Sequence, residues 1–175
     1  MNEDNRVSDL LDNFQQRGLY GFDRSKVEQA LPVSPAAVGK SLERLAAKGR
    51  VKRIRKSFHA IIPVEFASQG IPPSDWFIDD LMRSLDLPYY IGLLSAAALY
   101  GAAHQQVQHL QVIIPRQERS IELPGLTIRF FRKHDFSSTQ LQSRKGHSGM
   151  LPVSSPEATA LDLVRYARHI GGLDA

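Results

Sequence analysis

Apolar side chains recur at helical spacing through the first third of the chain. A stripe with spacings of three and four residues predicts an amphipathic helix over residues 6–17. Gly18 and Gly21 end that pattern. Asp23 can then cap a short helix over residues 24–31, which Pro32 must end because proline cannot continue a helix. The stripe of the first helix consists of Val7, Leu10, Leu11 and Phe14.

A third helix begins after a three-residue turn. Ser34 followed by Pro35 is typical of a helix start, since the hydroxyl caps the free amides and proline fits the first position. The spacing predicts a helix from there to Gly49, with an apolar stripe turned inward. The opposite face carries only small and basic residues. The inward stripe is Val38, Leu42 and Leu45, and the outward face is Ala36, Lys40, Arg44 and Ala47.

The pattern changes to a period of two after Gly49. Residues 50–55 and 58–62 are predicted to form two short strands around a basic turn at Lys56 and Ser57. Two helices, a tight turn, a third helix and a basic hairpin together indicate a winged helix-turn-helix over residues 1–63. In such a module the third helix enters the major groove of DNA and the hairpin follows the adjacent backbone.

The second part of the chain mixes helical and strand patterns. Residues 64–73 contain Gly70 and two prolines and are predicted to be a linker. After a helix over 74–85, the uncharged stretch 87–101 predicts a helix buried in a core or interface. Strands are predicted at 110–114, 120–123 and 126–132, with the last two joined by a turn at Pro124 and Gly125.

A polar loop is predicted over residues 135–149, followed by a last helix that begins at Ser155, Pro156 and Glu157. We expect Leu161 and Val164 to face inward from this helix, and Asp162 to pair with Arg165 on its surface. The expected fold class is therefore α+β, with a winged helix-turn-helix followed by a small mixed α/β domain over residues 74–175.

The charge is unevenly distributed between the two parts. Residues 1–63 contain twelve Lys and Arg against seven Asp and Glu, so their net charge is +5. The net charge of the whole chain is +4. Between residues 38 and 60, eight basic residues stand against the single acid Glu43. This distribution favours a polyanionic partner such as double-stranded DNA, although a solvated basic surface would have the same composition.

The basic residues of the predicted module have different expected roles. Arg53, Arg55 and Lys56 on the hairpin would contact phosphates, which gives affinity and salt dependence. Lys40 and Arg44 on the third helix are the candidates for contacts to base edges. Ser34 either caps its helix or helps the free amides to hold a phosphate, and both roles fit the sequence equally well.

The sequence contains none of the common enzyme motifs. It has no cysteine, no phosphate-binding glycine loop and no nucleophile elbow. His104 and His109 lie five residues apart, which does not match the spacing of a metal-binding pair on a helix. We therefore expect no catalytic residue, no metal and no cofactor. The acidic start of the chain and a longest apolar segment of only 15 residues lead us to expect a cytoplasmic protein without a signal peptide.

Several segments beyond the winged helix resemble a known family. Residues 88–96 (PYYIGLLSA), 112–116 (VIIPR), 128–131 (IRFF) and 154–163 (SSPEATALDL), together with His104, Gln105 and Gln106, are similar to the AbiEi-type antitoxins of type IV toxin–antitoxin systems in bacterial abortive infection. The resemblance implies a non-enzymatic repressor that regulates its own operon and counteracts a nucleotidyltransferase-type toxin. Members of this family continue further, so we expect the natural chain to extend beyond Ala175.

Two other functions are compatible with the sequence. The winged helix could serve as a protein-interaction module that binds an acidic protein surface without binding DNA. The second domain could instead be a metal-dependent nuclease that uses Asp135, Glu157 and Asp162, although each of these residues has a plainer role in a turn, at a helix start or in a surface pair. The operator sequence, the oligomeric state and the toxin-contacting residues cannot be predicted.

Overall fold

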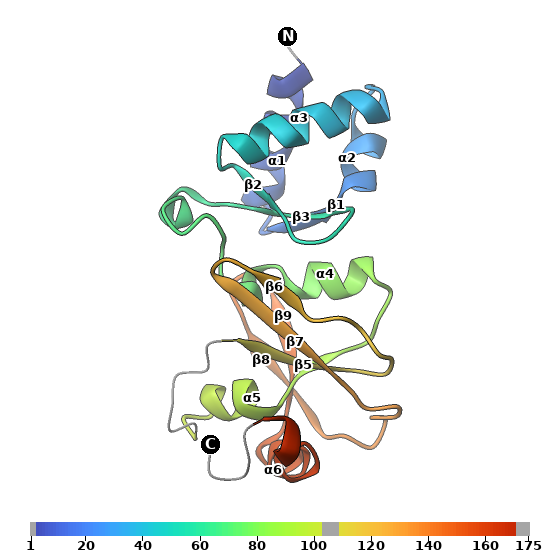
Figure 1. The fold of residues 1–175 in the computed structure, drawn as a ribbon, viewed down its shortest axis with the longest axis vertical. Helices are drawn as coiled ribbons and strands as arrows, with labels where there is room; N and C mark the ends of the chain where they lie inside the picture. Colours follow the sequence, from blue (N-terminus) through green and yellow to red (C-terminus); the bar gives the residue numbers. More distant parts are fainter. Residues whose placement is uncertain (1–2, 103–108, 171–175) are drawn as a thin grey trace. The chain divides into compact units, whose positions relative to one another are not determined.

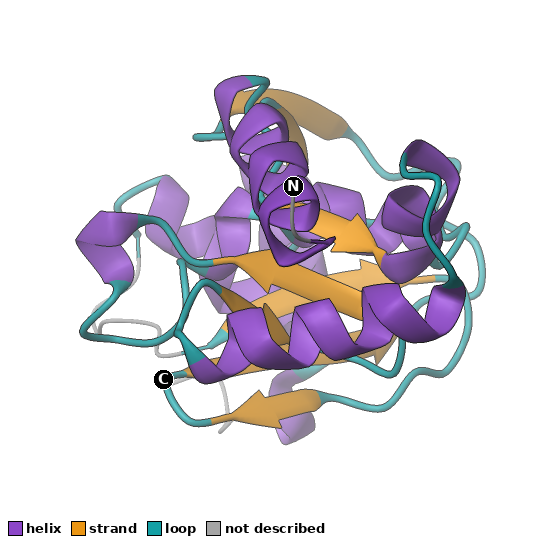
Figure 2. Cartoon of the chain, turned by 90° about the horizontal axis from the view of Figure 1, so that it is seen from above, coloured by secondary structure: helices purple, strands orange, loops and turns teal. Residues whose placement is uncertain are grey.

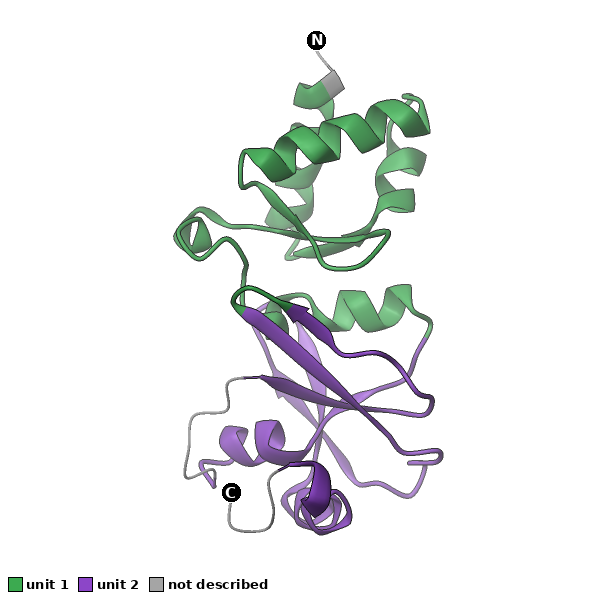
Figure 3. Ribbon diagram, viewed as in Figure 1, with its two compact units in different colours: residues 1–86, 123–125 green, residues 87–122, 126–175 purple. Residues whose placement is uncertain are grey.

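The computed structural model describes residues 3–102 and 109–170, which form two compact units (Figure 3). The first unit extends to Asp86 and includes Leu123–Gly125, and the second contains the remaining described residues. Residues 64–86 therefore group with the first unit. The domain limits at residues 63 and 73 remain a prediction about independent folding.

The first unit has the winged helix-turn-helix arrangement that the sequence predicts. Three helices lie on one face of a small antiparallel sheet with strand order β1-β3-β2 (Figures 1 and 2). The helices are α1 (Glu3–Gln16), α2 (Arg24–Ala30) and α3 (Pro35–Ala47), and the strands are β1 (Gly21–Asp23), β2 (Val51–Arg53) and β3 (Phe58–Ile61). The three residues of β1 are too few to show a period, so the sequence did not predict this strand. We call residues 51–61 the wing.

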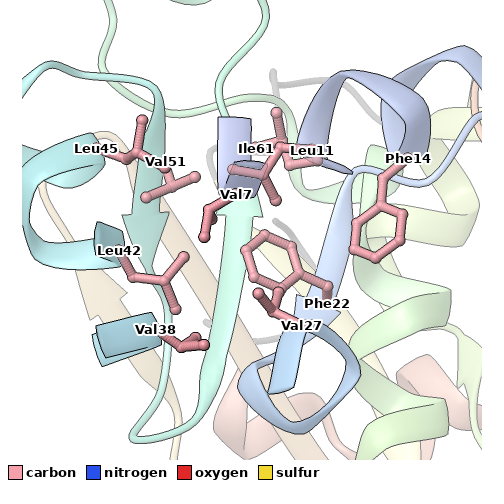
Figure 4. Packing of buried hydrophobic residues seen from close by; sticks show 10 residues of the cluster. All are labelled: Val7, Leu11, Phe14, Phe22, Val27, Val38, Leu42, Leu45, Val51 and Ile61. Carbon is pink, nitrogen blue, oxygen red and sulfur yellow. The ribbon is translucent and has the colours of Figure 1, made fainter. Parts of the chain in front are cut away.

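The apolar stripes of the three helices meet over this sheet. Residues from all three helices pack with Phe22 of β1, Val51 of β2 and Ile61 of β3 in one buried cluster (Figure 4). Both predicted helix caps are confirmed. The Asp23 carboxylate accepts a hydrogen bond from the amide of Ser25 at 2.9 Å, and the Ser34 hydroxyl accepts one from the amide of Ala37 at 3.2 Å.

A fourth helix covers the other face of the small sheet. Two 3-10 turns, Val64–Phe66 and Ser74–Trp76, lead to α4 (Ile78–Ser84), which packs against β1. The backbones approach closely because Gly21 has no side chain: a Cβ there would lie 2.9 Å from the Cβ of Asp80. The amide of Gly21 donates a hydrogen bond to the carboxylate of Asp80 at 3.2 Å.

The second unit is built on a six-stranded mixed sheet with strand order β6-β7-β5-β4-β9-β8 (Figure 1). Strand β5 is parallel to β7 and antiparallel to β4, while β9 is parallel to β4 and antiparallel to β8. Helices α5 and α6 pack against each other, α5 against β5 and α6 against β9. The strands are β4 (Tyr90–Ile91), β5 (Leu110–Ile114), β6 (Ile121–Leu123), β7 (Leu126–Arg132), β8 (Leu141–Lys145) and β9 (Met150–Ser154), and the helices are α5 (Leu93–Leu99) and α6 (Pro156–Arg165), followed by a 3-10 turn at Ala167–His169.

Two segments of this unit differ from the sequence prediction. The stretch 87–101 is not one helix but the strand β4 followed by the helix α5, because a central strand covered on both faces is as uniformly apolar as a buried helix. The predicted polar loop over 135–149 contains the edge strand β8. Its residues are mostly exposed, so they show no alternation of apolar and polar side chains.

The last helix begins where predicted but presents a different face to the core. The Ser155 hydroxyl caps α6 by accepting a hydrogen bond from the amide of Ala158. Leu161 and Val164, which we expected to face inward, are 72% and 64% exposed, and Asp162 is buried.

The chain has the α+β fold predicted from its sequence. None of the helices in the described residues has the length and apolar character needed to cross a membrane.

Candidate nucleic-acid interface

The acidic residues of α1 neutralise two of the basic residues that follow Val38. Asp4 accepts hydrogen bonds from Arg44 at 2.7 Å and from the hydroxyl of Ser41 at 2.6 Å, and Asp12 pairs with Arg50. The bonds from Arg44 and Ser41 lower the pKa of the Asp4 carboxyl below its ordinary value. Arg44, predicted to contact bases, is therefore held toward α1 by a carboxylate.

The other predicted residues of α3 lie at its surface. Lys40 is exposed in the middle of the helix, and Ser34 is exposed at its start. The hydroxyl of Ser34 is engaged in capping, as described above. A phosphate contact by the same residue remains a prediction.

A groove of about 580 Å³ lies between α3 and the wing. On the α3 side its wall consists of Gly39, Leu42, Glu43 and Ala46, whose small members leave room for a ligand. The wing contributes four basic or titratable side chains, and Arg24 of α2 completes the lining. Glu43 is the only acidic residue among those that line it. The wing residues in the groove are Val51, Lys52, Arg53, Lys56 and His59.

Arg24 was not predicted from the sequence to take part in this surface. Its guanidinium donates hydrogen bonds to the carboxylate of Glu28, at 2.7 Å, and to the carbonyl of Pro35 at the start of α3. It lies against Gly39, where an added Cβ would stand 3.2 Å from the Arg24 Nη1. Glycine costs about 1 kcal/mol relative to alanine inside a helix. A glycine within α3 was the available signal that another group approaches the helix there.

The predicted residues of the wing lie in two different places. Arg53 lines the groove with Lys52, whereas Arg55 lines a second depression with Ser84 and Leu85 of the α4 segment. Lys56 lines both. Lys40 and Arg44 each follow a groove residue by one position, so they lie about 100° around α3 from it. The six predicted residues thus cover more of the surface than one groove.

His59 is the residue of the groove whose ordinary pKa lies nearest to neutral pH. It pairs with Arg53 across the hairpin, stacks on the ring of Phe22 with centroids 5.6 Å apart, and is only 7% exposed. Its Nδ1 donates a hydrogen bond to the carbonyl of Ser57 at 3.2 Å. Burial lowers the pKa of the imidazole, and the charges of Arg53 and Arg24 lower it further. No pattern in the sequence indicated a buried histidine in the groove, because His59 stands in a strand among apolar residues.

The groove and the surfaces beside it are suited to bind phosphates. Four side chains that are cationic at neutral pH gather at one concave surface, where guanidinium and ammonium groups can donate charge-assisted hydrogen bonds to phosphate oxygens. A concave surface on which four cations stand against the single acid Glu43 also concentrates a positive electrostatic potential. The geometry therefore allows a nucleic-acid backbone to be held beside α3.

In the second unit the charged groups are used differently. The carboxylate of Asp162 is 2% exposed and accepts hydrogen bonds from Lys133 Nζ at 2.9 Å and from the hydroxyl of Tyr90 at 2.6 Å. Lys133 also donates to the hydroxyl of Thr139 at 3.0 Å. Burial and the bond to Asp162 raise the pKa of the Tyr90 phenol. The expected surface pair of Asp162 with Arg165 is wrong, because Asp162 faces inward and binds Lys133.

Polar residues of the segments 88–96 and 154–163, which carry the family resemblance, are also buried and hydrogen-bonded. Ser95 Oγ accepts a hydrogen bond from the amide of Gln111 at 2.9 Å, and the hydroxyls of Ser154 and Thr159 lie 2.7 Å apart. Asp135 accepts a bond from the amide of Ser137 in a turn. Within residues 3–102 and 109–170, no three His, Asp or Glu side chains gather closely enough to hold a metal ion.

The comparison with protein families identifies this second unit. Residues 90–175 match the model of the AbiEi antitoxin C-terminal domain. The chain carries an AbiEi antitoxin domain. The resemblance predicted from the sequence motifs is thereby confirmed, although His104, Gln105 and Gln106 lie outside the described residues. Membership of an antitoxin family implies a cognate toxin as partner. The comparison with curated proteins gave no match.

Proposed function

We propose that this AbiEi-type protein is a transcriptional repressor that binds its own promoter through the winged helix and counteracts a toxin through its C-terminal domain. The observation that carries the DNA-binding part is the basic groove beside α3, which stands next to the exposed Lys40. In a winged helix-turn-helix this is the side where the third helix and the wing meet DNA.

We assign different contacts to the basic residues of α3 and of the wing. Lys40 and Arg44 on α3 would contact base edges, while Arg53, Arg55 and Lys56 of the wing would contact phosphates. Ser34 would place a phosphate at the positive end of α3. Because Asp4 holds Arg44, we assign Lys40 the larger share of sequence discrimination.

The first test is a fluorescence-anisotropy titration of the chain on its own upstream DNA and on a scrambled duplex, at several salt concentrations. A preference of about 10³ or more for the upstream sequence is expected for specific recognition. Replacing Lys40→Ala together with Arg44→Ala should remove this preference. Equal, steeply salt-dependent affinity for both duplexes would contradict repression by sequence recognition, and no binding at low salt would favour the protein-interaction module instead.

The toxin-directed part rests on the match of residues 90–175 to the AbiEi antitoxin C-terminal domain. The nucleotidyltransferase class of the toxin is what the resemblance of the sequence motifs to this family implies. The test is co-expression of the chain with the nucleotidyltransferase-type toxin encoded in the same operon, and measurement of growth. Restored growth is the expected outcome. Continued arrest with both proteins detectable in the cell would contradict the assignment.

A further inference from the structure

The groove between α3 and the wing has a feature that phosphate binding alone does not require. A histidine whose burial favours the neutral form stands among side chains that remain cationic. It faces Asp23 and Arg24 at the β1–α2 junction, Lys52 and Arg53 on β2, Lys56 in the turn and Glu43 on α3. Such a placement makes the charge of His59 sensitive to whatever enters the groove.

The hydrogen bond at Nδ1 determines what the other ring nitrogen can do. Because the protonated Nδ1 donates a hydrogen bond to the carbonyl of Ser57, the neutral ring has an unprotonated Nε2 that can only accept a hydrogen bond. A phosphate oxygen also only accepts. The two atoms become compatible when Nε2 gains a proton, because the N–H can then donate a hydrogen bond to the phosphate oxygen.

We propose that the groove holds a phosphate of the DNA backbone between Arg24 of α2 and the wing residues Lys52, Arg53 and Lys56, and that His59 takes up one proton as this phosphate binds. The inference rests on the proposed DNA binding and adds to it two residues outside the predicted set, Arg24 and His59, and a dependence on pH. The backbone of DNA, rather than a free anion, is the occupant because the groove adjoins the exposed face of α3.

The sign of the pH dependence follows from the two states of His59. In the free protein its pKa lies below the ordinary 6.5, and the negative phosphate must raise it in the complex. Affinity for DNA is then constant above the pKa of the complex. It increases as the pH falls from there toward the pKa of the free protein, by at most about tenfold per pH unit for one proton.

The test measures binding of the upstream duplex between pH 8 and pH 5.5 for the native chain and for His59→Gln, which keeps an amide able to donate to Ser57. The native chain should bind more tightly as the pH falls, and the variant should lose this dependence. His134→Gln, at an exposed histidine of the second unit, is the matched control and should retain it. Identical pH profiles for the native chain and His59→Gln, with DNA binding intact, would overturn the inference and leave the proposed function standing.

A second measurement does not depend on the folding of a variant. NMR titration of the native chain gives the pKa of His59 alone, with the duplex and with inorganic phosphate. An increase with the duplex that inorganic phosphate at millimolar concentration does not reproduce supports the proposal. An unchanged pKa with bound duplex overturns it, an equal increase with phosphate overturns the assignment to DNA, and no duplex binding at any pH overturns the proposed function as well.

Discussion

The two units of this chain use the same kinds of charged residue in opposite ways. In the first unit, basic side chains gather around an open groove and on exposed faces, while the buried cluster beneath them is apolar. In the second unit, the pair of Lys133 with Asp162 lies inside the fold, where the hydroxyls of Tyr90 and Thr139 complete its hydrogen bonds. The role of a lysine or arginine near a sheet can therefore be assigned only when the burial of its side chain is known.

The difference predicts two kinds of failure on mutation. Loss of a charge in the second unit should lower the free energy of unfolding, because the partner stays buried and unpaired. Loss of a charge in the groove should lower affinity for DNA at nearly constant stability, because exposed side chains contribute little to folding. Each experiment below could break this distinction.

The largest effect is expected for Lys133→Met. The substitution leaves the buried carboxylate of Asp162 without its cation, which should lower the free energy of unfolding by about 3 kcal/mol or more in urea titrations. Adding Asp162→Asn should restore part of the loss, since the amide can still accept the hydrogen bond from Tyr90. A cost below about 1 kcal/mol for Lys133→Met would show that the pair behaves like one on the surface.

The next effect is expected for Arg53→Ala combined with Lys56→Ala. Removing two phosphate contacts should weaken binding of upstream and scrambled DNA alike and reduce the slope of log K against log salt by nearly two, at about 0.9 per contact. The midpoint of urea unfolding should stay close to that of the native chain. The matched control is Arg129→Ala with Lys145→Ala, which removes two exposed charges from the second unit. An equal change in slope for both pairs would mean that only net charge matters.

A smaller effect, opposite in sign, is expected for Asp4→Asn. Releasing Arg44 from its carboxylate partner should tighten DNA binding a few-fold and steepen the salt dependence by about one contact. Asp9→Asn, at an exposed position of the same helix, changes the net charge equally and should have less effect. Equal gains for the two variants would contradict a specific restraint on Arg44.

The same pair predicts how stability depends on pH. The pKa of the Asp4 carboxyl is lowered in the folded chain from its ordinary value of 3.8. Its pair with Arg44 therefore stabilises the fold fully at pH values above 3.8, and this contribution is lost as the pH falls through the lowered pKa. The difference in urea midpoint between the native chain and Asp4→Asn should therefore decrease below pH 4. A difference that stays constant down to pH 2 would contradict this linkage.

The sequence predicted those parts of the fold in which one face of an element is apolar. The stripes of α1 and α3, the caps at Asp23 and Ser34 and the alternation in β7 were all found where the pattern placed them. It did not predict β1, which is too short, or β4, which is apolar on both faces. The candidate interface was predicted only as a set of basic residues. Arg24 lines the groove because it packs against Gly39 of α3, a contact that no sequence periodicity predicts. Arg44 pairs with Asp4, which lies 40 positions away in the sequence, so this restraint could not be predicted either.

The smallest effect is expected on α6, where the sequence prediction chose the wrong face. Apolar spacing assigned Leu161 and Val164 to the core, but the buried contacts of this helix are made by Thr159 and Asp162, whose hydrogen bonds the pattern could not register. Leu161→Ser and Val164→Ser should each change the free energy of unfolding by about 0.5 kcal/mol or less, as at other exposed positions. Leu163→Ser should cost distinctly more in the same urea titrations, because Leu163 packs against the cluster around Tyr90 and Ile113. Equal costs at all three positions would mean that α6 buries a broader face than the structure shows. The buried hydrogen bonds of Thr159 and Asp162 would then not distinguish this helix from the open basic surface of the first unit.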